Sequence, residues 1–495
     1  MSPRLSRRQA ERRGLRLWPV GAVLVLAFTT AVLVAAAVFY AGWDLLGARE
    51  LKPERRIDSK TLFDLVKLAF GVVAGAGALV ALVVAYRRQR VDEDGALRDA
   101  TRLHTERFTT AVSQLGEESA AVRLGGVHAL AGLADDAPTR ELRQTGIDVL
   151  CAYLRLPYTA EEDLPSDDAA ARHTYLALRE VRHTVIRLLR DHLRLPLQHH
   201  HSWQGHDFDF TGVVFDGGDL SEAQFSGGTV NFAGAVFSGG TVDFRAATFS
   251  GGIVSFLGAE FSGGTVGLVG AKFSGGKVYV ARAVFSGGTV SFRGAEFSGG
   301  TVDFRAAEFS GGTVDLSRAM FSGGTVDFRA AVFSGGKVDF SRAVFSGGKV
   351  DFSRAVFSGG TVDLSETTFS GSTIDFRAAV FSAGTVDFRA AMLSAGTVDL
   401  SGATFTGGTV DFRAAVFFDG TVDLSGAVFF DGTVSFHIAT FSGATVDFSA
   451  AMFSGGTVDF SGADGTVPPS LASAASSPLP DGLTLATSWQ PSGPS

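Results

Sequence analysis

The sequence predicts an α+β multidomain protein with two transmembrane helices, a small α-helical domain and a β-helical solenoid. Two long apolar stretches lie near the N-terminus, at about residues 17–43 and 65–86. Apolar residues then recur at three-to-four spacing through residues 91–195, which is typical of helices. From Phe225 onward a twelve-residue unit repeats twenty times, which indicates a solenoid whose units contact only their neighbours.

The two apolar stretches predict a transmembrane hairpin over residues 17–86. Each exceeds the roughly 20 residues that a helix needs to cross the hydrocarbon layer. The basic segment 1–16 precedes the first stretch and Arg87 and Arg88 follow the second, so both termini are expected in the cytoplasm. We therefore expect a multi-pass protein of the bacterial inner membrane, with the lipid bilayer as a partner. A cleaved signal peptide is the alternative for the first stretch, but a second stretch follows it.

The α-helical domain is expected over residues 91–195, and a linker over 196–206 follows it. The linker carries His199–His201 and His206, but adjacent histidines do not form a fixed metal site without further ligands, so no metal is expected. Cys151 is the single cysteine and lies on an apolar helical pattern. It is therefore predicted to be a buried, inert thiol.

The repeat unit reads Phe-Ser-Gly-Gly-Thr-Val-Asp-Phe-Arg-Ala-Ala-x. Polar and apolar residues alternate along Thr-Val-Asp-Phe and again along Ala-x-Phe-Ser, which predicts two half-buried strands in each unit. The Gly-Gly pair separates them, because glycine adopts turn conformations at no steric cost. Representative residues predicted to point into the solenoid core are Phe225, Val230, Phe232, Ala235, Phe237, Phe304, Phe309, Phe328 and Phe333.

The unit also divides into two pentapeptides and two extra residues, as in Asp399–Ala403, Thr404–Gly408 and then Thr409 and Val410. Together with the spacing by five of Phe210, Phe215, Leu220 and Phe225, this pattern resembles the pentapeptide-repeat family over residues 207–463. The resemblance implies a right-handed, four-sided β-helix. Two units then form one coil of 24 residues, which we favour because its interior residues match those of the family. A flat coil of one unit is the rival.

A second resemblance concerns residues 104–158. Phe108, Gln114–Gly116, Val122–Gly126 and Ala129–Leu130 are similar to the juxtamembrane helical segment of actinobacterial membrane-anchored pentapeptide-repeat proteins. It implies a shared architecture and no particular activity. Physically, such a helical domain could cap the open end of the β-helix. Residues 464–495 are rich in Pro, Ser, Ala and Gly and predict a disordered tail.

The sequence contains no phosphate-binding loop, nucleophile elbow or zinc-spaced cluster, so neither an enzyme nor a cofactor is expected. The outward Asp and Arg rows are interpreted as a solvated face. Phe418 and Phe430 put an extra Phe on an exposed turn and form a candidate interaction patch.

We therefore expect a non-catalytic, membrane-anchored scaffold or interaction module that binds a protein partner not yet identified, and no nucleic acid. One alternative is an acidic DNA mimic acting on gyrase or another DNA-binding protein, as the resemblance implies for some soluble family members. The other is a structural spacer or self-assembling rod, which would form homo-oligomers through an open C-terminal end.

Overall fold

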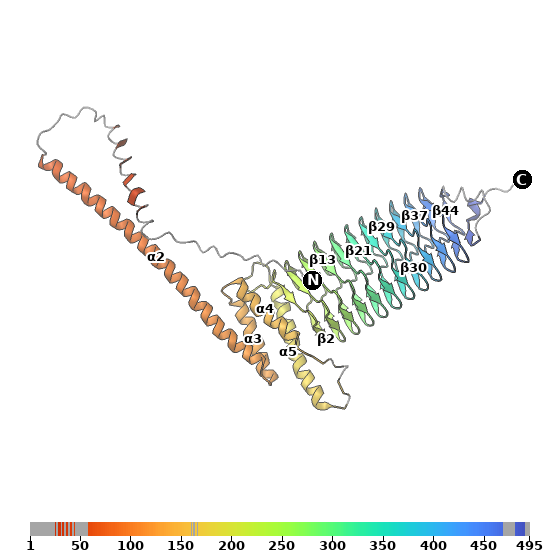
Figure 1. Ribbon diagram of the computed structural model, residues 1–495, viewed down its shortest axis with the longest axis horizontal. Helices are drawn as coiled ribbons and strands as arrows, with labels where there is room; N and C mark the ends of the chain where they lie inside the picture. The colour runs from red at the N-terminus through yellow and green to blue at the C-terminus, as the bar shows by residue number, and fades with distance from the viewer. Residues whose placement is uncertain are drawn as a thin grey trace, which may run out of the picture. The chain divides into compact units, whose positions relative to one another are not determined.

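The computed structural model describes residues 58–159, 161, 164–165, 167–468 and 481–490, together with scattered positions between 25 and 44. The chain divides into two compact units, Met1–Leu103 and His104–Ser495. The long helix α2 (Ser59–Leu115) begins in the first unit and ends in the second. The described residues of the second unit also form three shorter α-helices and the solenoid (Figure 1).

Helix α2 differs from the second transmembrane helix that the sequence predicted. The apolar stretch 65–86 does not form a separate helix, because the same helix continues through Arg87 and Arg88 to Leu115. Among the described residues, no helix is long and apolar enough to cross a membrane. The expected hairpin over residues 17–86, and with it the expected multi-pass inner-membrane location, is therefore wrong. The basic segment 1–16 and most of the first stretch, 17–43, lie outside the described residues.

The helical part of the second unit contains the end of α2 with α3 (Ala120–Asp135), α4 (Arg140–Leu154) and α5 (Ala169–Arg194). Helix α4 begins after Thr139, whose Oγ1 accepts a hydrogen bond from the Leu142 amide at 3.3 Å. Helix α5 begins in the same way after Asp168. Such caps satisfy amide groups that a first helical turn leaves unpaired. Fully buried apolar residues that join these helices are Val127, Leu130, Ile147, Leu150, Val185 and Leu189.

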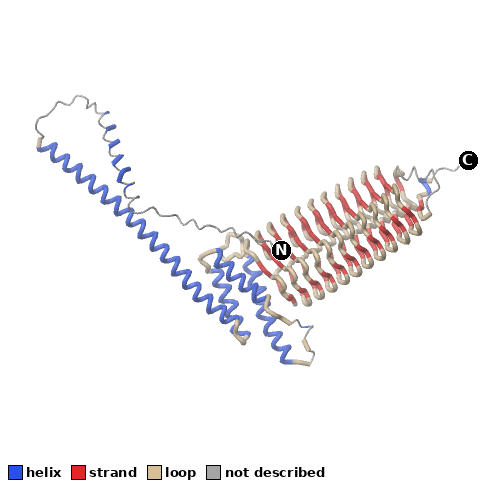
Figure 2. Tube along the Cα trace, in the orientation of Figure 1, coloured by secondary structure: helices blue, strands red, loops and turns tan. Residues whose placement is uncertain are grey.

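The solenoid is built from four parallel sheets, here named A to D in the order in which the chain visits them. The strands are short and alternate with turns (Figure 2). In sheet A, Val302 pairs with Val278 and Val326, so paired residues are 24 positions apart. Two repeat units therefore make one coil, and the flat twelve-residue coil is excluded. Eleven coils at about 4.8 Å each give a rod of about 50 Å.

Each coil contributes one strand to each sheet. Sheet A contains β1 (Phe208–Asp209), β5 (Thr229–Asn231), β9 (Ile253–Ser255), β13 (Lys277–Tyr279), β17 (Thr301–Asp303), β21 (Thr325–Asp327), β25 (Lys349–Asp351), β29 (Thr373–Asp375), β33 (Thr397–Asp399), β37 (Thr421–Asp423) and β41 (Thr445–Asp447). Sheet B contains β2 (Val214–Phe215), β6 (Val236–Phe237), β10 (Glu260–Phe261), β14 (Val284–Phe285), β18 (Glu308–Phe309), β22 (Val332–Phe333), β26 (Val356–Phe357), β30 (Val380–Phe381), β34 (Thr404–Phe405), β38 (Val428–Phe429) and β42 (Met452–Phe453).

Sheets C and D complete the coil. Sheet C contains β3 (Gly218–Asp219), β7 (Thr241–Asp243), β11 (Thr265–Gly267), β15 (Thr289–Ser291), β19 (Thr313–Asp315), β23 (Lys337–Asp339), β27 (Thr361–Asp363), β31 (Thr385–Asp387), β35 (Thr409–Asp411), β39 (Thr433–Ser435), β43 (Thr457–Asp459) and β45 (Leu483–Thr484). Sheet D contains β4 (Gln224–Ser226), β8 (Thr248–Ser250), β12 (Lys272–Ser274), β16 (Glu296–Ser298), β20 (Met320–Ser322), β24 (Val344–Ser346), β28 (Thr368–Ser370), β32 (Met392–Ser394), β36 (Val416–Phe418), β40 (Thr440–Ser442) and β44 (Asp464–Gly465). Sheet A is thus opposite sheet C, and sheet B is opposite sheet D.

Phenylalanine ladders fill the interior of the solenoid. All nine residues named above as the predicted core are at most 3% exposed. The rings of Phe304 and Phe328 lie 4.7 Å apart at 6°, and those of Phe309 and Phe333 lie 4.8 Å apart at 3°. The corner glycines allow the coils to approach this closely. A Cβ on Gly252, whose φ is +97°, would lie 2.0 Å from the Gly228 carbonyl oxygen.

Helices α4 and α5 cover the first coil of the solenoid. The Ile186 side chain lies so close to Gly218 that a Cβ there would be 2.9 Å from Ile186 Cδ1. The Arg182 guanidinium donates hydrogen bonds to the carbonyl oxygens of Leu154, at 2.7 Å, and Val214, at 2.6 Å. The helices therefore shield apolar residues that the first coil would otherwise expose.

The last coil is covered by residues 481–490, which the sequence placed in a disordered tail. Strand β45 pairs with β43, and Trp489 lies at the end of the short 3₁₀ helix η2 (Thr487–Trp489). Gly465 pairs with Phe441 and so occupies a position that Phe fills in earlier coils. The Trp489 ring packs 5.6 Å from the Phe441 ring and 5.8 Å from the Phe460 ring. This segment is ordered because its apolar side chains cover the exposed end of the core.

Candidate interaction surfaces

A buried polar cluster joins helix α5 to the first coil. Asp216 accepts hydrogen bonds from the hydroxyls of Tyr158, at 2.5 Å, and Tyr175, at 2.7 Å, and His183 Nε2 lies 3.4 Å from it. Burial opposes ionisation of Asp216, but hydrogen bonds from His183, Tyr158 and Tyr175 outweigh burial and hold its pKa well below the usual value. These polar groups are engaged in holding the helices to the solenoid. No motif predicted the cluster, because its members are far apart in the sequence.

The expected linker is also part of this helical cap. His206 is buried, and its Nδ1 lies 2.9 Å from Gln144 Oε1. Burial, together with repulsion by the positive charges of Arg140 and Arg143, lowers the pKa of His206 to about 4, so this side chain is neutral at pH 7. Within the described ranges, no group of three His, Cys, Asp or Glu side chains is arranged to hold a metal ion. Burial also raises the pKa of the Cys151 thiol to about 12.

The Asp and Arg rows on sheets A and C are paired with each other. The Asp303 carboxylate accepts a hydrogen bond from the Arg305 backbone amide at 3.0 Å, and its Oδ2 lies 2.6 Å from Arg305 Nη2. The Asp therefore closes its own turn and neutralises the following Arg. The side chain of Asp303 is buried, whereas that of Arg305 is half exposed.

Lysines connect some of these aspartates between coils. Lys349 Nζ lies 2.8 Å from the Asp351 carboxylate and 2.7 Å from the Asp375 carboxylate of the next coil. Burial opposes ionisation of Asp375, but hydrogen bonds from Arg377 and Lys349 outweigh it and lower its pKa to about 2. Most of the charge in these coils is therefore paired within the rod, while arginine side chains such as Arg305 and Arg377 stay half exposed on its surface.

Charge is unevenly distributed along the rod. Over residues 272–389 there are 13 Lys and Arg and 11 Asp and Glu, so the two signs nearly balance. Over residues 397–465 there are eight aspartates, and Arg413 is the only Lys or Arg. The last third of the rod is thus strongly acidic, and it attracts cationic groups.

Phe418 and Phe430 lie in this acidic third, and their side chains are 43% and 51% exposed. Phe418 ends β36 in sheet D, whereas Phe430 directly follows β38 in sheet B. Because sheets B and D are opposite each other, the structure does not bring the two side chains together. The single patch predicted from the sequence is therefore two separate sites. This separation follows from two units forming one coil, the arrangement that the sequence favoured, because consecutive units then lie on opposite sheets.

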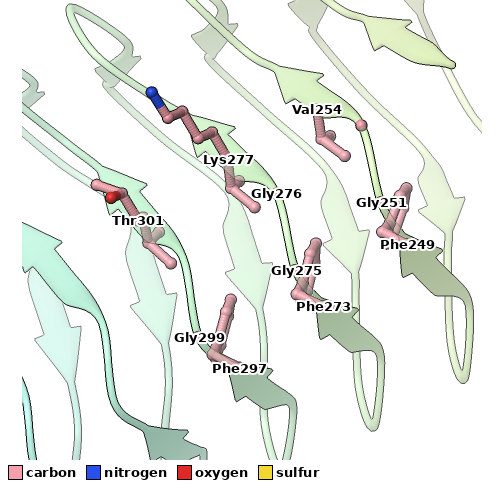
Figure 3. Close-up of a pocket in the computed structure, with 13 residues that line it drawn as sticks. Phe249, Gly251, Val254, Phe273, Gly275, Gly276, Lys277, Phe297, Gly299 and Thr301 are labelled. Carbon is pink, nitrogen blue, oxygen red and sulfur yellow. The ribbon is translucent and has the colours of Figure 1, made fainter. Parts of the chain in front are cut away.

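The cavity shown in Figure 3 is too small to hold an organic ligand. This cavity lies at a corner between consecutive coils, where Phe249, Phe273 and Phe297 follow one another beside Gly251 and Gly275. Its volume is about 20 Å³, which is enough for about one water molecule. These coils would therefore bind a partner through their outer faces.

Comparison with known proteins agrees with this architecture. Residues 210–260 match the family model described as pentapeptide repeats (9 copies). No curated protein and no solved structure matches the chain. The repeat region is thus a pentapeptide-repeat β-solenoid. The match lies within the first coils and gives no support to the membrane-anchored, actinobacterial type.

Proposed function

We propose that the protein is a non-catalytic interaction module whose solenoid binds a partner protein through its side faces. The observation that carries this proposal is the presence of two exposed phenylalanines, Phe418 and Phe430, in the acidic last third of the rod. Exposed aromatic side chains are common anchors of protein interfaces. The covering of both ends of the rod, by the helices and by residues 481–490, also favours recognition from the side.

A non-catalytic role is supported by the way in which polar groups are used. Asp216 and its partners hold the helical cap, and the described Asp and Arg rows pair within the rod. Pentapeptide-repeat solenoids are generally non-catalytic, and this one follows their architecture.

The acidic last third also supports a second candidate, a DNA mimic that binds gyrase or another DNA-binding protein. Its eight aspartates and single arginine favour a basic surface on the partner. Suppression of gyrase supercoiling by the purified protein at stoichiometric amounts would support this candidate, and unchanged supercoiling would refute it for gyrase. A self-assembling rod is less well supported, because the C-terminal end is covered by Trp489 and β45.

The proposed function is tested with a shortened rod that keeps both ends. Deletion of Phe273–Thr440 removes seven complete coils. It joins Lys272, the first residue of β12, to Phe441, the second residue of β40, so that the new strand of sheet D keeps the residue order of the original strands. Cross-linking followed by affinity capture is then compared between the full chain and this deletion variant. A partner captured only by the full chain supports an interaction module. If both proteins capture the same partners, the side faces of the deleted coils are not the binding surface.

A further inference from the structure

Two consecutive repeat units differ from the others in the same way. They begin Phe417-Phe418-Asp419-Gly420 and Phe429-Phe430-Asp431-Gly432. The second position is Ser or Thr in the other units, and the third is Gly or Ala. Both units therefore replace a small polar residue by Phe and a small residue by Asp, and the four new side chains are all exposed.

The fold itself does not need these replacements. The exposed Phe side chains leave apolar surface in water without adding to the core. Asp419 also has a φ of +48°, in the left-handed region where eight of its counterparts in sheet D corners, such as Gly323 and Gly347, are glycines of positive φ. The fold requires this conformation at the corner but does not require an Asp there, which is reason to look for a function at this position.

The half-coil offset gives the two sites similar surroundings on opposite faces. Phe418 lies in sheet D, where strand β36 pairs with β32 and Val416 is level with Met392. Phe430 lies beside sheet B, where β38 pairs with β42 and Val428 is level with Met452. Met392 and Met452 are 45% and 57% exposed. Each site thus combines a Phe, a Met, a half-buried Val and an Asp.

The electrostatics of these sites select a cationic partner. Asp419 and Asp431 are exposed beside Phe418 and Phe430, and Arg413 is the only Lys or Arg between residues 397 and 465. A guanidinium group satisfies both features, because it stacks on an aromatic face and donates paired hydrogen bonds to a carboxylate. The methionine and valine then provide adaptable apolar contact for a neighbouring side chain.

We propose that Phe418 and Phe430 mark two equivalent docking sites on opposite faces of the rod, each binding an arginine-containing segment of a partner protein. One rod therefore binds two such segments and can hold one partner molecule on each of these two opposite faces. The inference rests on the proposed function and adds to it the chemistry and the stoichiometry of the partner.

The probe is a twelve-residue peptide of Arg-Leu-Gly repeats, titrated calorimetrically into the full-length protein, with a Glu-Leu-Gly peptide as the negative control. We expect two Arg peptides per wild-type rod, and one for Phe418→Ser and for Phe430→Ser. The double variant should bind at least tenfold more weakly. Ser is the residue of the other units at this position, so these variants keep the repeat pattern.

Asp447→Asn is the matched control for a general effect of charge. It removes one negative charge from the acidic third but retains an oxygen for the hydrogen bond from the Ser449 amide. We expect it to change the affinity by less than twofold. A single peptide per wild-type rod, no binding, unchanged binding by the double variant, or equal weakening by Asp447→Asn would each overturn the inference.

The peptide titration and the capture experiment fail independently. A partner that requires the coils Phe273–Thr440 but binds the Phe418→Ser, Phe430→Ser double variant equally well would leave the interaction module standing and refute the two docking sites. If no partner depends on those coils, the interaction module itself is refuted, whatever the peptide result.

Discussion

Replacing Trp489 by alanine is expected to open the last coil of the solenoid. Trp489 is only 6% exposed, and its ring packs on Phe441 and Phe460 at the end of the interior ladders. Removing a buried tryptophan side chain costs about 3 kcal/mol or more. Since the coils contact only their neighbours, this loss should be confined to the end of the rod.

Hydrogen exchange measures this loss coil by coil. Each 1.4 kcal/mol is a factor of ten, so a loss of about 3 kcal/mol lowers the protection of the amides in residues 441–465 by about a hundredfold. Amides near Phe304 and Phe328, several coils away, should keep their protection. Ser488→Ala is the control, because Ser488 is exposed next to Trp489 and its loss should change little.

Two results would refute this reasoning. If Trp489→Ala leaves the protection of residues 441–465 unchanged, the segment 481–490 does not stabilise the end of the core. If protection falls equally along the whole rod, the coils unfold as one cooperative body, and the nearest-neighbour account of their stability is wrong.

Three further predictions concern the solenoid. The folded pKa of Asp375 is about 2, below its unfolded value of about 3.9, so the ionised carboxylate should contribute about 2 kcal/mol to the free energy of unfolding above pH 4, and this contribution is lost as the pH falls toward 2. The free energies of unfolding of wild type and Asp375→Asn, measured by denaturant melts, should therefore converge near pH 2. A difference that stays constant with pH would contradict the lowered pKa as its cause. Ile438 has a φ of +53°, which is strained for a β-branched residue, so Ile438→Asn should stabilise the last coils by about 1 kcal/mol in the same melts whereas Ile438→Val should not. Deleting one coil, Phe297–Met320, should leave a folded rod by circular dichroism, and loss of all β structure would refute the solenoid's local stability.

The interior of the rod was largely predictable from the sequence. Alternation around Val302 and Phe304 fixes which residues point inward, and a one-residue shift would expose the Phe ladders. The surface sites were less predictable. Phe418 and Phe430 were found as departures from the repeat but were interpreted as one patch, although the favoured 24-residue coil already implies that consecutive units lie on opposite sheets.

The two ends of the chain show what sequence patterns miss. Apolar composition at residues 65–86 predicted a transmembrane helix, but composition does not show that α2 continues to Leu115. The Pro- and Ser-rich composition after residue 464 likewise predicted disorder. It did not show that Gly465 leaves space for Trp489, because Trp489 lies beyond the last repeat unit and no repeated residue marks its position.

The half-coil unit has a consequence for how such a rod can change in length over generations. Recombination between near-identical repeats adds or removes whole units of twelve residues, whereas a coil needs 24. Gain or loss of an even number leaves every later residue on its original sheet. An odd number turns the distal part of the rod by half a revolution and exchanges sheet B with sheet D. Because Phe418 and Phe430 lie one unit apart, each of the two faces would still carry one phenylalanine after a change of either parity.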